Sequence, residues 1–249
     1  MNNLNNIGVV VLAAGRGTRL KSVDIPKVMR EIGARPILDF TVETLEKTGF
    51  KPEQICLVIG FQKEKVMEHF GGRVTYAVQS EQKGTAHAAF TGMVALPKNL
   101  QHVLVMGGDD SAFYKPETLK NLIFEHLKSN AVLTLLTAKV EFPVSLGRIV
   151  RHENGEVEII EKEYLTEEQK KLNEISTGTF VFDRAWFEKN YPTMPPMRKL
   201  GEYGLPTALR MARGQKKIYQ IISLQNPDEW YGVNTLEELE EANRRKNIV

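Results

Sequence analysis

Apolar residues in the first half of the chain form short, β-branched runs that alternate with segments of helical spacing. The runs predict strands at residues 8–12, 55–59, 74–79 and 103–106. Segments with helical periodicity or high alanine content lie between them and predict crossover helices at 37–47, 63–70 and 85–95. Strands that alternate with helices predict an α/β fold with a Rossmann-like, mixed but mostly parallel sheet flanked by helices.

The second half has a less regular pattern. It predicts four more strands, at residues 131–140, 147–151, 156–160 and 179–183, and the second and third of them flank the Asn154-Gly155 turn signal. A charged helix is predicted at residues 236–245. The stretch 191–204, with three prolines and two glycines, predicts a mobile loop over the site. No repeat or linker divides the chain, so we expect residues 1–249 to form one domain.

Composition narrows the class of protein. The chain has 249 residues, 26% of them charged, and a formal net charge of +2, so nucleic acid is not an expected partner. Neither a signal-peptide pattern nor an apolar run of about 18 residues is present, which predicts a cytoplasmic protein without a membrane partner. The one cysteine, Cys56, lies in an apolar run and is expected to be a small buried residue.

The first predicted strand leads directly into a glycine-rich loop, Gly15-Arg16-Gly17-Thr18-Arg19. Glycines let backbone N–H groups close around an anion, and arginine adds charge-assisted hydrogen bonds. The loop has neither the lysine and hydroxyl residue of a P-loop nor the third glycine of a dinucleotide-binding motif. Lys27 follows Pro26, which fixes the backbone before a cation that can reach the same phosphates.

Together these residues resemble a known family. The pattern LAAGxGxRL at residues 12–20, followed by Pro26-Lys27, is similar to the signature of sugar-nucleotide pyrophosphorylases, a group of nucleotidyltransferases. Residues 79–88 resemble the Q-x-E-Q-x-G-T-x-H-A motif of the uridylyltransferase domain of N-acetylglucosamine-1-phosphate uridylyltransferase. The likeness covers nearly the whole chain and implies a nucleotide-diphospho-sugar transferase fold, with a nucleotide-binding half at 1–110 and a sugar-binding half at 111–249.

The resemblance assigns the nucleotide to two loops. In and just before the glycine-rich loop, the expected nucleotide contacts are Leu12, Ala13, Gly15, Gly17 and Thr18. The expected catalytic cations are Arg19 at the end of the loop and Lys27 after it. In the second loop, Gln79, Gly84 and Thr85 contact the base. A glutamine amide is both donor and acceptor, which suits the imide edge of uracil. We expect His87 to be a helix residue packed beneath the base.

The resemblance also implies a Mg²⁺ site at Asp109 and Asn234. Asp109 follows a predicted strand, so its carboxylate should lie at the same sheet edge as the glycine-rich loop. Mg²⁺ takes few ligands from protein and the rest from water and phosphate. The neighbouring Asp110 is either a further ligand or a surface carboxylate, and we favour Asp109.

The sugar half matches the family less closely. Gly147 lies in its GRI turn, and Glu161 stands where a glutamate binds sugar hydroxyls. Ser176, however, replaces an asparagine in E-I-N-T-G, and Pro206-Thr207 stand where threonine and aspartate are expected. The sugar is therefore left open among N-acetylglucosamine, glucose, galactose and rarer sugars.

The expected reaction joins UTP and a sugar 1-phosphate to give a UDP-sugar and pyrophosphate. Two alternatives remain: a nucleotidyltransferase that uses another nucleoside triphosphate, and a catalytically silent regulator that binds a nucleotide sugar. The sequence contains no hexapeptide repeats, so acetyl transfer is not expected.

Overall fold

The computed structural model describes residues 4–20, 24–141, 143, 146–197 and 201–247. The strands are β1 (Ile7–Ala13), β2 (Glu31–Ile32), β3 (Arg35–Pro36), β4 (Ile55–Ile59), β5 (Thr75–Val78), β6 (His102–Gly107), β7 (Leu133–Lys139), β8 (Arg148–Arg151), β9 (Val157–Ile160), β10 (Glu174–Asp183) and β11 (Tyr219–Ser223). The α-helices are α1 (Ile37–Thr48), α2 (Lys63–Phe70), α3 (Thr85–Ala95), α4 (Pro116–Ser129), α5 (Glu167–Lys170), α6 (Arg184–Asn190), α7 (Pro206–Gly214) and α8 (Leu236–Asn247).

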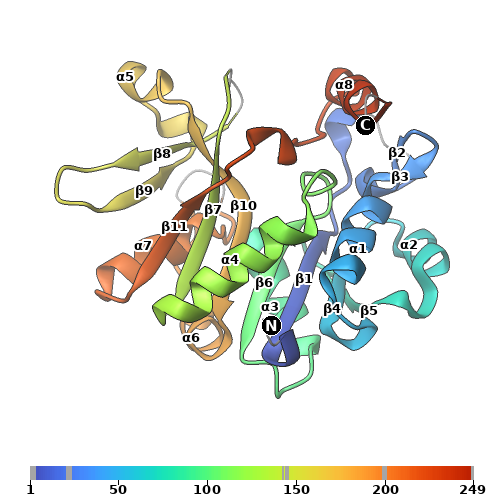
Figure 1. The fold of residues 1–249 in the computed structure, drawn as a ribbon, viewed down its shortest axis with the longest axis horizontal. Helices are drawn as coiled ribbons and strands as arrows, with labels where there is room; N and C mark the ends of the chain where they lie inside the picture. The colour runs from blue at the N-terminus through green and yellow to red at the C-terminus, as the bar shows by residue number, and fades with distance from the viewer. Residues whose placement is uncertain (1–3, 21–23, 142, 144–145, 198–200, 248–249) are drawn as a thin grey trace.

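A central sheet runs through the molecule (Figure 1). In the described residues it has seven strands in the order β11-β7-β10-β6-β1-β4-β5. β10 is antiparallel to both of its neighbours, and the other pairs are parallel. The predicted mixed, mostly parallel sheet is therefore confirmed. β8 and β9 form a separate antiparallel hairpin around the Asn154-Gly155 turn.

The two faces of the sheet bury different helices, which explains why its central strands are apolar throughout. Val9 and Val11 of β1 pack in a cluster with buried residues of α1, α2 and α4. Val10 points to the other face, in a cluster with α3, α6 and α7. All three valines are fully buried. Strands covered on both faces read as continuous hydrophobic runs rather than as alternating patterns.

Several predicted elements match the structure and others do not. The strand at 55–59 and the helices at 63–70 and 85–95 are β4, α2 and α3. The strand predicted at 179–183 is wrong at its start, because β10 begins at Glu174 and contains a register shift between Ser176 and Phe180. The sequence pattern did not predict α4, α5, α6, α7, β2, β3 or β11.

The predicted loop at 191–204 packs against residues 83–86. Its described part begins with a short 3-10 helix, Tyr191–Thr193, and residues 198–200 lie outside the described residues. The Tyr203 N–H donates to the Lys83 carbonyl at 2.7 Å, and the Ala86 N–H donates to the Tyr203 carbonyl at 2.7 Å. This pairing holds the end of the loop beside the start of α3.

The parallel register brings three loops to one edge of the sheet. Leu12 of β1 lies beside Val58 of β4 on one side and Gly107 of β6 on the other. The Gly108 N–H donates to the Leu12 carbonyl at 3.0 Å. The segments that follow β1 and β6 therefore start from neighbouring positions, at the carboxyl edge where open α/β sheets bind ligands.

Candidate active site

The glycine-rich loop leaves β1 at Ala13 and continues into a 3-10 helix, Thr18–Leu20. Apart from its chain neighbours, no described residue lies within 4 Å of the position that a Cβ on Gly15 would occupy, so this side of the loop is open to a ligand. Gly17 has a φ of +70°, and a Cβ there would lie 2.7 Å from the Cβ of Lys27. Gly17 is thus needed both for the turn and for the close approach of Lys27.

Lys27 lies at the centre of a polar cluster. It begins the 3-10 helix Lys27–Met29, directly after Pro26. Its ammonium donates to the Asp109 carboxylate and, at 2.7 Å, to Oδ1 of Asn234. Arg19 donates to the same Asn234 oxygen at 3.0 Å. The two predicted catalytic cations and the two predicted metal ligands therefore meet, although they lie far apart in the sequence.

The Asp109 and Asn234 oxygens fit a cation, because both already accept from the Lys27 ammonium. A backbone hydrogen bond from Val233 to the Asp109 carbonyl, 3.1 Å long, holds the two segments together. No group of three or more His, Cys, Asp or Glu residues suited to a metal occurs within the described ranges. The donor set is thus sparse and made of hard oxygens, which fits Mg²⁺ better than a metal that needs a full protein cage.

Asp110 is not the surface carboxylate considered above. Its Oδ1 atom is buried and has no hydrogen-bond partner among the described residues. Burial, followed by the neighbouring Asp109 carboxylate, raises the pKa of Asp110 well above its ordinary value. The carboxylate lies in the same cavity as Asp109 and Asn234.

The proposed base-binding loop holds Gln79 in a fixed orientation. Gln79 is buried, and its amide nitrogen donates to Nδ1 of His87 at 2.9 Å. Burial, followed by the charge of Lys83, lowers the pKa of His87, which favours the neutral ring that can accept this hydrogen bond. His87 therefore orients the glutamine, a contact that the sequence motif did not reveal.

Gly84 and Thr85 connect this loop to the segment before α7. Gly84 has a φ of +101°, and a Cβ on it would lie 2.5 Å from the Tyr203 carbonyl oxygen. The Thr85 hydroxyl accepts from the Leu205 N–H at 3.0 Å. Gln82, which the sequence pattern did not single out, donates to the Ala14 carbonyl at 2.8 Å and so joins the two loops predicted to bind the nucleotide.

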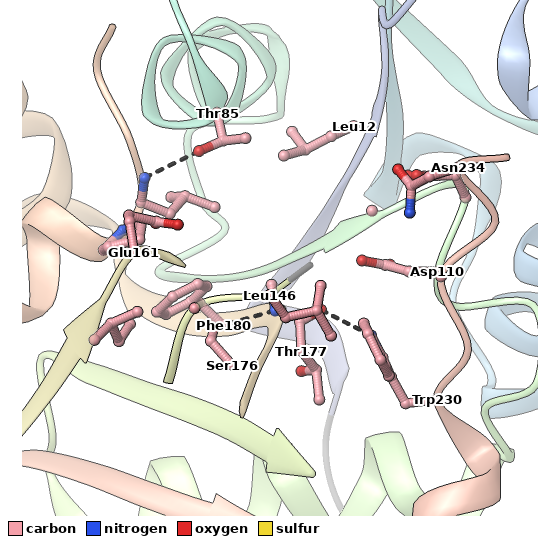
Figure 2. A pocket seen from close by; sticks show the side chains of 18 residues that line it. Leu12, Thr85, Asp110, Leu146, Glu161, Ser176, Thr177, Phe180, Trp230 and Asn234 are labelled. Atoms are coloured by element: carbon pink, nitrogen blue, oxygen red, sulfur yellow. Dashed lines mark hydrogen bonds between the residues drawn. The ribbon is translucent and has the colours of Figure 1, made fainter. Parts of the chain in front are cut away.

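A cavity of about 370 Å³ lies beside these loops (Figure 2). It brings together seven of the predicted site residues: Leu12, Thr85, Asp109, Gly147, Glu161, Ser176 and Asn234. The others lie outside its lining: Ala13, Gly15, Gly17, Thr18, Arg19, Lys27, Gln79 and Gly84. Trp230 lines the cavity as well, and its indole N–H donates to the Thr177 carbonyl at 3.1 Å. The one sequence signal for it was its position four residues before Asn234.

Of the predicted sugar residues, Glu161 lies on the side of the cavity opposite Asp110 and Asn234 (Figure 2), and Gly147 and Ser176 also line the cavity. Burial, followed by the charge of Glu163, raises the pKa of Glu161. A Cβ on Gly147 would lie 2.7 Å from the Ile160 carbonyl oxygen, so glycine is needed there. The Ser176 hydroxyl accepts from the Gly178 N–H at 3.2 Å and keeps its own proton available for a ligand.

Comparisons with known proteins all identify nucleotidyltransferases as similar to this chain. A family model described as "Nucleotidyl transferase" matches residues 8–247. Proteins named bifunctional protein GlmU are similar in sequence: that of Symbiobacterium thermophilum is 37% identical over 97% of this chain and 51% of its own length. That of Carboxydothermus hydrogenoformans is 36% identical over 90% of this chain and 49% of its own length. The chain thus spans about half the length of these relatives.

The fold is also found in a solved structure. A Bacillus anthracis protein assigned as a glucose-1-phosphate thymidylyltransferase, crystallised in complex with a sucrose, superposes with a TM-score of 0.80. The match covers 98% of this chain and 96% of the other, at 19% sequence identity, so it supports the fold alone. No helix in the described part of the chain is long and apolar enough to cross a membrane. On the family model and the sequence relatives, the chain belongs to the nucleotidyl transferase family.

Proposed function

We propose that this nucleotidyltransferase is a Mg²⁺-dependent uridylyltransferase that converts UTP and a sugar 1-phosphate to a UDP-sugar and pyrophosphate. One observation carries the proposal. A single cavity contains Leu12 and Thr85 from the nucleotide loops, Asp109 and Asn234 from the cation cluster, and Glu161 from the opposite side. Such a cavity suits a substrate pair whose reacting phosphates meet between a base and a sugar.

The reaction needs positioning and charge stabilisation more than proton transfer. A sugar 1-phosphate has a second pKa of about 6, so it is largely a dianion near neutral pH and needs no general base. One of its oxygens bonds to the α-phosphorus of the nucleotide while the bond to the departing pyrophosphate breaks. Lys27 and Arg19 provide positive charge where these phosphates meet. Mg²⁺ on Asp109 and Asn234 would neutralise further phosphate charge.

Gln79 supports the choice of a uracil base. Because its amide nitrogen already donates one hydrogen bond to His87, the amide cannot flip without losing that contact. Its amide nitrogen also donates to the Gly84 carbonyl at 3.4 Å, so the group left to pair with a base is its oxygen, which can accept from the N3–H of an imide. Cytosine offers no N3–H and would leave an acceptor facing an acceptor. Thymine shares the imide edge, so dTTP is the critical competitor in any test.

For the sugar, we propose a hexose or N-acetylhexosamine 1-phosphate, with Glu161 accepting from ring hydroxyls. Ser176 is shorter than the family asparagine, and its oxygen already accepts from Gly178. It therefore presents one hydroxyl donor to a ligand instead of an amide.

The test is pyrophosphate release with Mg²⁺, each nucleoside triphosphate in turn and a panel of sugar 1-phosphates. We expect release with UTP and at least one of the sugars, and none from an Asp109→Asn variant. Activity with CTP or dTTP but not UTP would contradict the base assignment. Nucleotide binding without release in any combination would favour the silent regulator, which the intact cluster of Lys27, Asp109 and Asn234 now argues against.

A further inference from the structure

Asp110 is a carboxylate of the cavity to which the proposed reaction assigns no role. It lies in the turn that follows β6, and both ends of this turn are fixed. The Gly108 N–H donates to the Leu12 carbonyl at 3.0 Å, and the Val233 N–H donates to the Asp109 carbonyl at 3.1 Å. The position of the Asp110 side chain is therefore set by the same contacts that bring Asp109 and Asn234 together.

Two glycines frame this carboxylate. A Cβ on Gly107 would lie 2.6 Å from Oδ1 of Asp110 and 3.0 Å from Oδ2, so a larger residue there would displace the carboxylate. On the other side, a Cβ on Gly178 would lie 3.5 Å from Oδ2, and Gly178 itself has a φ of +75°. The space for the carboxylate thus depends on the absence of a side chain at position 107.

Among the described residues this carboxylate forms no ion pair, and the charge of Lys27 and the contact with Trp230 only partly offset the effects of burial and of Asp109 on its pKa. Lys27 is bonded to Asp109 and Asn234, and Arg19 is bonded to Asn234. Oδ1 of Asp110 has no partner among the described residues, and a buried acceptor without a partner is unfavourable until a ligand satisfies it. A sugar hydroxyl could satisfy one lone pair but would leave adjacent carboxylates facing anionic substrates. A cation would neutralise the charge that both oxygens share.

We propose that Asp110 is a third protein ligand of the divalent cation, beside Asp109 and Asn234, and that the protein consequently binds this cation before the nucleotide arrives. The inference rests on the metal site of the proposed function. With one carboxylate and one amide, Mg²⁺ depends on nucleotide phosphates for much of its binding energy, whereas a second carboxylate strengthens binding to the free protein.

The test uses Mn²⁺ as the probe and the full chain without nucleotide or sugar. Free Mn²⁺ is followed by electron paramagnetic resonance during titration. We expect Asp110→Asn, which keeps the shape of the side chain, to weaken Mn²⁺ binding at least about tenfold. Glu161→Gln is the matched control, because it neutralises a carboxylate of the same cavity on the opposite side, and its Mn²⁺ affinity should be that of the unmodified protein.

A second comparison separates ligation from folding. In the unmodified background, Gly107→Ala should displace the carboxylate and weaken Mn²⁺ binding as Asp110→Asn does, whereas in an Asp110→Ala background it should have no further effect. Unchanged Mn²⁺ affinity in Asp110→Asn, or an equal effect of Gly107→Ala in both backgrounds, would overturn the proposal. Because no nucleotide is present, these results are independent of whether UTP is the substrate.

Discussion

Replacing Lys27 should change turnover and metal affinity in opposite directions. The Lys27 ammonium lies between the Asp109 carboxylate and the Asn234 oxygen, the two groups proposed to hold the metal. Lys27→Met keeps most of the aliphatic stem and removes the charge, so it isolates the role of the ammonium.

The magnitudes follow from the charges involved. A +1 and a +2 charge about 4 Å apart repel by about 2 kcal/mol even with the dielectric constant of water, which is about thirtyfold in affinity. Lys27→Met should therefore bind Mn²⁺ at least about tenfold more tightly without nucleotide. Loss of one donor that stabilises transition-state charge should lower kcat about 100- to 1,000-fold. The side chain of Asp109 remains 25% exposed, so losing this ion pair should cost at most about 1 kcal/mol of stability.

Three measurements together test this reasoning. Pyrophosphate release gives kcat, Mn²⁺ titration gives the affinity of the free protein, and urea unfolding shows that the variant is folded. Lys98→Met, at an exposed surface position, is the control for loss of a positive charge. Near-normal turnover in Lys27→Met would refute its role with the phosphates, and weaker Mn²⁺ binding would refute competition between the ammonium and the metal.

Three further predictions concern other parts of the structure. Gly17→Ala should lower kcat more than stability, because its Cβ would lie 2.7 Å from that of Lys27; comparing pyrophosphate release with urea unfolding checks this. Since burial raises the pKa of Glu161, its charged form opposes folding, so Glu161→Gln should raise the free energy of unfolding at pH 7, and the gain should vanish below pH 4.5. Burial lowers the pKa of His126 to about 3, so the unfolded chain takes up a proton below pH 6.5 that the folded protein does not, and the free energy of unfolding falls with the pH. His126→Asn should flatten this dependence by about 1 kcal/mol per pH unit in urea unfolding, and an unchanged slope would contradict the reasoning.

The sequence pattern located α3 and β4 correctly, because the residues of each element mark where it begins and ends. Helix α3 starts after the positive φ of Gly84, and β4 is a fully buried apolar run, so both were located from their own residues. Strand β11 is half-buried at the edge of the sheet and has no fully buried position, so its pattern is weak. Strand β10 was predicted too short because the polar residues and Gly178 at its start resemble a turn, whereas the register shift accommodates them.

The candidate site depended more on motifs than on periodicity, and its internal contacts could not be predicted from either. The motif predicts Gln79 as a base contact, but the hydrogen bond that Gln79 donates to His87, which fixes the orientation of the amide, appears only when α3 lies beside the end of β5. Likewise, Asn234 reaches Lys27 because Val233 pairs with the backbone of Asp109. These contacts join residues that are far apart in the chain, and no local pattern encodes them.

For Asp110, the contacts between residues far apart in the chain change the functional inference. In the sequence it is a second acidic residue beside a better candidate, and a solvated carboxylate is the ordinary outcome for such a neighbour. In the structure, Gly107 makes space for it, Gly178 lies on its other side and its Oδ1 has no partner among the described residues. The glycine at 107 ends a strand, where it would otherwise be attributed to backbone freedom. Its φ is not positive, so the close approach of the Asp110 carboxylate is the physical reason for a glycine there.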